Sequence, residues 1–177
     1  FVACYGEDRL ALVDLDADPP TVERFDVGPG VSFGAPSYGP YVAVLTPDER
    51  FVAVSNQVSK DVRFFDVEAK GFDFDRTIQV QGVPMFPTFL EGGAELLLPT
   101  QTPDGIVRAD MSTGETLDAR AFTGAECPYP HSVEVHGPHY FVVCEGDKRS
   151  PGKVVRLDAQ LQITAEATVG VFPDAMA

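Results

Sequence analysis

The stretch Tyr41–Gly71, YVAVLTPDERFVAVSNQVSKDVRFFDVEAKG, decides the fold. It contains three short apolar runs, YVAVL, FVAVS and VRFFDV, separated by polar segments. Pro47 presets its own φ and Asp48 can accept a hydrogen bond from the backbone that follows, so Thr46–Glu49 is typical of a turn. Two Val-rich runs on either side of such a turn predict a β-hairpin. With the third run and the following FDRTIQV, the stretch predicts one antiparallel sheet of four strands.

This four-strand pattern recurs along the chain. The aspartates that close the third strand of each unit lie 52, 44 and 48 residues apart: Asp14, Asp66, Asp110 and Asp158. Each fourth strand then leads into a glycine followed by a proline: Gly28 and Pro29, Gly82 and Pro84, Gly124 and Pro128, Gly170 and Pro173. We interpret the aspartates as turn caps, whose carboxylates accept hydrogen bonds from backbone N–H groups further along the chain. A repeat of 40 to 50 residues with four strands is typical of a β-propeller blade.

We therefore expect an all-β chain, a β-propeller of four-stranded antiparallel blades with about four blades in this sequence. The blades are expected at about residues 1–28, 29–82, 83–124 and 125–170, and the segment 171–177 is expected to start a further blade. Phe1 aligns with the start of a second strand, so the first blade is predicted to lack its innermost strand.

The second unit, TPDERFVAVSN followed by VRFFDV, resembles the repeat of YVTN-type β-propellers. In that repeat a Ser-Pro-Asp-Gly turn precedes a Tyr-Val-Thr-Asn-like strand and a Val-x-Val-Ile-Asp strand. The resemblance extends over four copies, although FVAC, LLLP and FVVC replace the name-giving tetrapeptide and only the second copy keeps the Pro-Asp turn. It implies a seven-bladed-type propeller, with lactonase-like and nitrite-reductase-like propellers as wider relatives. It implies little about chemistry, because such propellers serve as binding modules, lactonases and redox-enzyme domains.

Two arrangements of the blades fit the ends of the chain. A proline that leads into an innermost strand lies 11 residues before the second strand in two units, from Pro40 to Phe51 and from Pro130 to Phe141. Pro173 begins the same lead-in but has no such hairpin after it. Either the chain closes on itself as four blades, or it is part of a larger propeller. We favour the larger propeller, because YVTN-type propellers usually have more blades and an open one exposes a strand edge and an apolar face.

The net charge of the chain limits the kinds of partner that we expect. The 177 residues include 27 acidic and 13 basic ones, for a net charge of −14. This field repels phosphate backbones and anionic lipid, so we expect neither nucleic acid nor a membrane surface as partner, and it favours solubility or cation binding. No apolar run is long enough to span a bilayer. The chain begins at Phe1 without a targeting segment, so we expect a processed, trimmed or excised product.

The three cysteines leave two interpretations open. A disulfide between Cys127 and Cys144 requires Pro128 and Pro130 to fold the lead-in back onto the second strand of the last blade, and Cys4 then stays free. Buried free thiols are the alternative. The spacing does not suit a metal site. The disulfide interpretation favours an extracytoplasmic protein, either periplasmic or secreted.

Three histidines lie within nine residues of one another, at His131, His136 and His139. His136 and His139 flank a Gly-Pro turn, and His131 lies at the other end of that strand, about 17 Å away. We therefore expect no common metal site, because zinc and copper require imidazoles that converge on one point.

His131 heads an innermost strand, and we take its repeat equivalents to be Tyr41, Thr88 and Asp174. A ring of these four side chains around the channel mouth is our candidate site for a small polar ligand, with rim residues that only contact solvent or one another as the alternative. The charged loop that starts at Glu145 and ends at Gly152 is a weaker indication of recognition on the same blade.

The leading hypothesis is a non-catalytic binding or scaffold propeller, extracytoplasmic, for a protein or small polar ligand, without a cofactor. The alternative is a propeller-type enzyme or enzyme subunit, a lactonase-like hydrolase or redox-enzyme domain, in which His131 and Asp174 converge at the channel. A third hypothesis is a segment of a larger propeller assembly that associates with further blades or another chain.

Overall fold

The computed structural model describes residues 1–29 and 37–174, and its strands form four antiparallel sheets. The expected start of a further blade at 171–177 lies partly outside the described residues. The strands are β1 (Val2–Cys4), β2 (Arg9–Asp14), β3 (Thr21–Asp26), β4 (Pro40–Leu45), β5 (Phe51–Asn56), β6 (Asp61–Asp66), β7 (Gly71–Gln79), β8 (Val83–Pro84), β9 (Thr88–Phe89), β10 (Glu95–Gln101), β11 (Gly105–Asp110), β12 (Thr116–Ala121), β13 (Pro130–His136), β14 (His139–Cys144), β15 (Pro151–Leu157) and β16 (Ile163–Val171). A single-turn 3₁₀ helix, η1 (Tyr5–Glu7), joins β1 to β2. Within the described ranges no helix is long and apolar enough to cross a bilayer.

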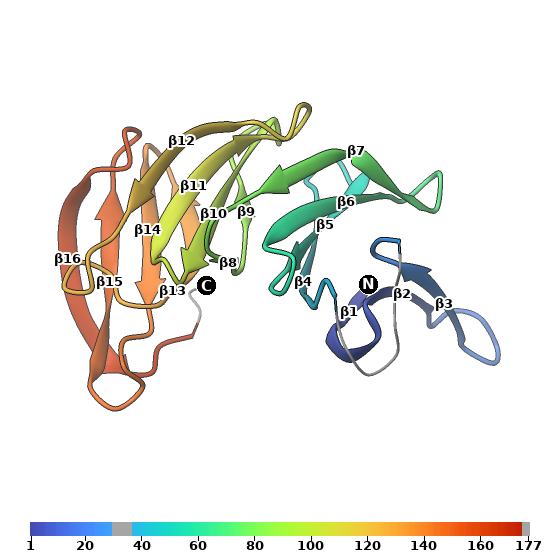
Figure 1. Cartoon of the computed structure of the whole chain (residues 1–177), viewed down its shortest axis with the longest axis horizontal. Helices are drawn as coiled ribbons and strands as arrows, with labels where there is room; N and C mark the ends of the chain where they lie inside the picture. Colours follow the sequence, from blue (N-terminus) through green and yellow to red (C-terminus); the bar gives the residue numbers. More distant parts are fainter. Residues whose placement is uncertain (30–36, 175–177) are drawn as a thin grey trace.

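Each sheet is an up-and-down meander, and we call them blade 1 (β1–β3), blade 2 (β4–β7), blade 3 (β8–β12) and blade 4 (β13–β16). Figure 1 shows them side by side along an arch that does not close, with β4, β8 and β13 on its concave side and β7, β12 and β16 on its convex side. The innermost strand of blade 3 is broken into β8 and β9, which both pair with β10. Blade 1 has only three strands, in the order β1-β2-β3. The expected all-β propeller architecture, with a first blade that lacks its innermost strand, is confirmed.

The hydrophobic core lies between the sheets, because side chains alternate across each strand. All six residues of β5 are buried. Phe51 and Ala53 belong to the cluster shared with blade 3, whereas Val52 and Val54 belong to the cluster shared with blade 1. A third cluster joins blades 3 and 4 around Leu97. The second strands β5 and β10 therefore each contribute to two cores and fix the position of the blades on either side.

The interpretation of the repeat aspartates as turn caps is confirmed. Asp14, Asp66 and Asp158 accept hydrogen bonds from backbone N–H groups two to four residues on, as does Asp110. The carboxylate of Asp110 accepts from the hydroxyl of Ser112 at 2.6 Å and from the N–H groups of Ser112 and Thr113 at 2.7 and 2.8 Å. These hydrogen bonds, that of the Ser112 hydroxyl first, lower the pKa of Asp110 from 3.8 to about 2. The ionised form of Asp110 thus closes the turn between β11 and β12.

A disulfide joins Cys127 to Cys144, with their Cα atoms 5.1 Å apart, and Cys4 is a free thiol. Both joined residues are buried in the cluster between blades 3 and 4. This is the pairing that the sequence left open beside buried thiols. Because Cys144 ends β14 and pairs with Pro130 at the start of β13, the bond holds the lead-in of blade 4 against its second strand.

We expect Asp110→Ala to lower stability at neutral pH, and the loss to shrink in acid. The folded-state pKa of Asp110 lies below the ordinary value, so the stabilisation by its carboxylate is complete above about pH 4 and is lost as the pH falls through about 2. Urea unfolding at a series of pH values measures the difference from wild type. Asp75→Ala, on an exposed position of β7, is the control and should cost little. A difference that grows on acidification would contradict the assignment.

The Cys127→Ala/Cys144→Ala double variant is expected to lose about 3 kcal/mol of unfolding free energy, since the bond closes a loop of 17 residues. Urea unfolding with and without dithiothreitol measures the loss. The reductant should lower the midpoint of the wild type and of Cys4→Ala, but not that of the double variant. A wild-type midpoint that ignores the reductant would refute the role assigned to the disulfide.

Candidate functional site

The innermost strands begin at the concave rim of the arch, and two of them have the same irregularity at this point. The pairing register of β4 with β5 and of β13 with β14 shifts directly after the first residue of the innermost strand. The residues left out of the two ladders are Tyr41 and His131. Such a β-bulge turns a side chain away from its ordinary direction in the strand. The two residues thus occupy the same special position in blades 2 and 4.

The backbone before each bulge also repeats. The residue that precedes the proline has a positive φ in three copies: 64° at Gly39, 53° at Tyr129 and 53° at Phe172. This left-handed conformation is ordinary for glycine and uncommon for aromatic residues. Phe172, Pro173 and Asp174 therefore repeat the lead-in of a blade, and Asp174 takes the position that His131 has in blade 4.

The expected equivalence of Thr88 with His131 is wrong. Thr88 pairs with Leu97 on β10, and the matching positions of the other innermost strands are Val44 and Glu134. Pro84, opposite Thr100, is the true counterpart of Pro130. The misalignment arises because the innermost strand of blade 3 is interrupted between β8 and β9, which conceals its register. The 11-residue spacing from the proline to the start of the second strand, which holds from Pro40 to Phe51 and from Pro84 to Glu95, is the signal that identifies the register of blade 3.

Phe86 takes the place on the rim that was assigned to Thr88. Its ring lies 5.8 Å from that of Tyr41, edge-on, and 4.8 Å from the imidazole of His131, measured between centroids. Its N–H donates to the carbonyl oxygen of His131 at 3.1 Å. The rim thus runs from Tyr41 through Phe86 to His131 and on to Asp174. Tyr41 is joined to His131 through Phe86, and the hydrogen bonds of the described residues include none between Thr88 and this set.

Polar groups converge on His131. Its Nδ1 lies 2.7 Å from the backbone carbonyl oxygen of Asp174 and 3.2 Å from the carboxylate Oδ1 of the same residue. Its Nε2 lies 3.4 Å from Oε1 of Glu145. His131 and Glu145 are buried, whereas the Asp174 side chain is 69% exposed. The rim therefore holds the buried imidazole of His131 and the buried carboxylate of Glu145 next to the exposed carboxylate of Asp174.

Glu145 is the member of the candidate site that the sequence did not single out beyond its place at the start of a charged loop. It follows β14 directly, and its N–H donates to the carbonyl oxygen of Tyr129 at 3.0 Å. Cys144, its neighbour, is held by the disulfide. The register gives Glu145 two counterparts, Gln57 and Gln101, each directly after the residue that pairs with the proline of the innermost strand. A charged residue at a repeat position that is otherwise neutral is the sequence signal that could have identified Glu145.

The loop after Glu145 folds over the cluster. The Lys148 ammonium lies 3.3 Å from Oε2 of Glu145 and 4.5 Å from the centre of the Phe172 ring. Asp147 accepts hydrogen bonds from the N–H groups of Ser150 and Arg149 at 2.6 and 2.9 Å, and these bonds lower its pKa. The loop conformation therefore sets one lysine beside a buried carboxylate and an aromatic ring.

Three potential ligand atoms, one each from His131, Glu145 and Asp174, lie within 4.8 Å of one another. An imidazole and two carboxylates can bind a cation or move a proton. The other two histidines do not take part, because His136 and His139 pair with each other at the far end of the β13–β14 hairpin. The rim cluster therefore depends on carboxylates from outside the histidine-rich segment.

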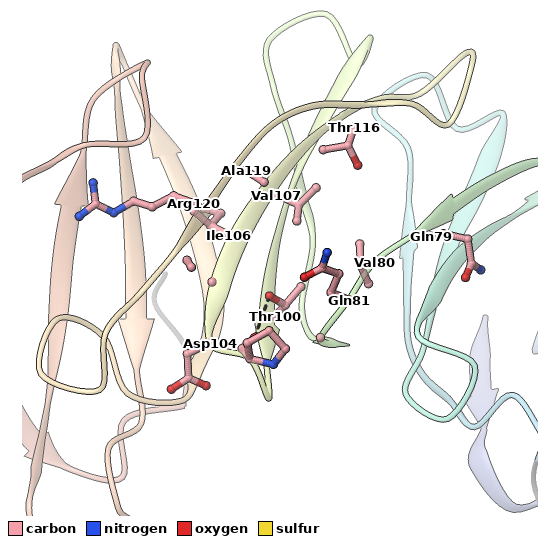
Figure 2. A pocket seen from close by; sticks show the side chains of 14 residues that line it. Gln79, Val80, Gln81, Thr100, Asp104, Ile106, Val107, Thr116, Ala119 and Arg120 are labelled. Carbon is pink, nitrogen blue, oxygen red and sulfur yellow. Dashed lines mark hydrogen bonds between the residues drawn. The ribbon is translucent and has the colours of Figure 1, made fainter.

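A groove of about 420 Å³ between blades 2 and 3 is the competing location. Figure 2 shows Ile106 and Val107 of β11 in its wall beside the uncharged polar side chains of Gln81, Thr100 and Thr116, and Arg120 extends away from it. Arg120 is bound to Glu126 and Gln162, and Asp104 accepts from the N–H of Tyr129. The charged residues of the lining are thus committed to other partners, and the groove offers little chemistry.

Comparisons with known proteins identify the fold and not a family. No protein-family model matches the chain, and no curated protein matches it. Among solved structures, the chain is similar to Kuenenia stuttgartiensis hydrazine synthase at 17% identity and a TM-score of 0.73, over 92% of this chain and 44% of that one. It is similar to the dihydro-heme d1 dehydrogenase NirN at 14% identity and a TM-score of 0.67, over 91% and 33% of the two chains.

A third similarity is to the β-propeller domain of Cps50 (Swd1) from Myceliophteria thermophila, at 14% identity and a TM-score of 0.55, over 73% of this chain and 39% of that one. The chain spans less than half the length of each of these three structures. At such identities the likeness carries the fold alone. The chain is an open, four-bladed stretch of β-propeller.

Proposed function

We propose that this chain is a non-catalytic binding segment of a YVTN-type β-propeller, and that its ligand site is the rim cluster of His131, Glu145 and Asp174. The observation that carries the proposal is the burial of the Glu145 carboxylate beside the His131 imidazole, next to the exposed Asp174. A buried charge is costly unless partners compensate it. Lys148 contacts Oε2 of Glu145, so Oε1, which lies beside His131, is the oxygen that a ligand at the rim would engage.

The charges of the site favour a small cationic ligand. Two carboxylates, Glu145 and Asp174, face one ammonium group, that of Lys148. The net charge of the whole chain is −14. Such a field raises the local concentration of cations and repels anions. The aromatic ring of Phe86 lies next to the His131 imidazole, and that of Phe172 lies next to the Lys148 ammonium, so both add apolar surface to the site.

An enzyme is the second candidate, because a histidine held by a carboxylate is the arrangement of a general base. Hydrazine synthase and the dehydrogenase NirN are enzymes by name, and their likeness to this chain extends to the fold. The hydroxyl of the adjacent residue, Ser132, donates to the carbonyl oxygen of Asp174. Within the described part of the chain, no Ser, Thr or Cys side chain is hydrogen-bonded to His131. We therefore favour binding over nucleophilic catalysis.

The binding segment belongs, in this proposal, to a larger propeller in an extracytoplasmic compartment. β1 is an edge strand of its sheet, and Val2 within it is 50% exposed. The lead-in at Phe172–Asp174 extends the repeat beyond blade 4. Further blades, from another segment or another chain, would cover both ends of the arch. The disulfide supports the compartment, because such bonds persist in oxidising surroundings.

A thermal-shift panel tests the cation preference. We expect at least one of methylguanidinium, Ca²⁺ and Zn²⁺ to raise Tm, and acetate and phosphate to leave it unchanged. At 100 times its Kd a ligand adds about 2.7 kcal/mol, or about 5–10 °C for a chain of this size. Glu145→Gln should abolish the rise and keep the fold, since Gln57 and Gln101 hold the same repeat position.

Glu134→Gln is the matched control, because it removes a carboxylate from an exposed position of β13 in the same blade. It should leave the response to cations unchanged. The proposed function is wrong when no cation raises Tm, or when the rise survives in Glu145→Gln.

We expect the isolated chain to associate, because β1 leaves a strand edge open to pairing. Size-exclusion chromatography with light scattering should give a mass above the 19.1 kDa of one chain. Val2→Lys places a charge on that edge and should shift the sample toward the monomer. A monodisperse wild-type monomer would contradict the proposed larger assembly.

A further inference from the structure

The two nitrogens of His131 cannot both be satisfied by a neutral imidazole, which carries a single N–H. Nδ1 lies 2.7 Å from the backbone carbonyl oxygen of Asp174, and a carbonyl can only accept. This contact assigns the proton to Nδ1. When the imidazole is neutral, Nε2 presents its lone pair to the Glu145 carboxylate oxygen at 3.4 Å, between side chains that are 5% and 4% exposed. A cation between Nε2 and Oε1 would turn this repulsion into two favourable contacts.

The separation of these two atoms suits a shared metal ion. Zinc binds imidazole nitrogen and carboxylate oxygen at about 2.0–2.2 Å in a tetrahedral arrangement, which places two ligand atoms about 3.4 Å apart. Nε2 of His131 and Oε1 of Glu145 are 3.4 Å apart. The third ligand atom, from Asp174, lies in the group of atoms that are all within 4.8 Å of one another. The exposed Asp174 side chain has the freedom to close the remaining distance.

The surroundings of the three groups support a metal ion. A histidine that binds metal generally donates its other N–H to a carbonyl or carboxylate, which fixes the tautomer. The Nδ1 contact with the Asp174 carbonyl has this form. With two carboxylates and the Lys148 ammonium, the site has a net charge of about −1. A divalent cation changes this net charge to about +1, so the magnitude of the charge does not increase.

Comparison of Glu145 with its counterparts in the other blades indicates that it does not have their structural role. Its counterparts are amides that donate an N–H toward the innermost strand of the following blade: Gln57 to the sulfur of Met85 at 3.6 Å and Gln101 to the carbonyl oxygen of Pro130 at 3.2 Å. An ionised carboxylate has no proton to donate. Blade 4 thus replaces a structural donor with an acceptor, at the one repeat position where a histidine lies opposite.

We infer that His131 Nε2, Glu145 and Asp174 form a binding site for one divalent transition-metal cation of the zinc type. The inference rests on the proposed function and names the class of its ligand. One imidazole with two carboxylates is a donor set that suits zinc. Calcium requires six to eight oxygen ligands, and the cluster provides the oxygens of only two side chains.

Isothermal titration with ZnCl₂ tests the site, on chelator-treated full chain in a Cys4→Ser background, with inductively coupled plasma metal analysis on the same sample. We expect one zinc per chain. Glu145→Gln and His131→Ala should weaken binding by about 100-fold or more, and Asp174→Asn, on an exposed side chain that leaves the fold intact, by at least about 10-fold. Ca²⁺ should bind far more weakly. The matched control is His136→Ala/His139→Ala, which removes the two distant histidines and should bind zinc as the parent does.

The ¹⁵N resonances of His131 provide a readout at the atom itself. Zinc should shift Nε2 and leave the proton on Nδ1. Zinc binding that survives Glu145→Gln, that disappears in His136→Ala/His139→Ala, or that exceeds one ion per chain without saturation overturns the inference. So does an imidazole that carries both protons and takes up no zinc. When zinc fails but methylguanidinium still stabilises the chain through Glu145, only this inference is overturned. When none of methylguanidinium, Ca²⁺ and Zn²⁺ binds, the proposed function falls with it.

Discussion

The second strands of blades 2 and 3 must bury both of their faces, and the rest of the structure depends on this constraint. In β5 every residue is buried, with Val52 and Val54 packed toward blade 1 and Phe51 and Ala53 toward blade 3. No blade can satisfy such a strand alone, because its own sheet leaves both faces uncovered. The blades therefore stack into the arch of Figure 1, and the same requirement remains at the open ends of the arch.

Stacking of the blades does not by itself explain why polar side chains gather at the rim. The bulges at the starts of β4 and β13 take one residue out of each ladder. In blade 4 that residue is His131. The disulfide holds Cys144 next to Pro130 and thereby sets Glu145 opposite the bulge. The position of the candidate site thus follows from an irregularity in one strand and a covalent bond to another, both within blade 4.

The repeat separates structural from functional residues. The turn-capping aspartates keep one residue type in all four blades, because the same backbone N–H groups must be satisfied each time. The position directly after the partner of the lead-in proline instead carries Gln57, Gln101 and Glu145, and the rim position carries Tyr41, His131 and Asp174. Variation at a fixed backbone position is how one scaffold acquires different sites. The charged members of both sets meet at the junction that follows blade 4.

The strands, their period, the missing innermost strand and the turn caps were determined by the sequence itself, since each depends on alternation and turn chemistry within one blade. His131 and Asp174 were also recognisable, because their position follows a proline at a fixed spacing. Only the tertiary structure decided that Phe86 and not Thr88 completes the rim, and that Glu145 faces His131. The break between β8 and β9 conceals the register of blade 3, and the contact of Glu145 with His131 arises from a bulge and from packing between strands. Contacts of that kind carry no periodic signal, so the pattern of residues could not reveal them.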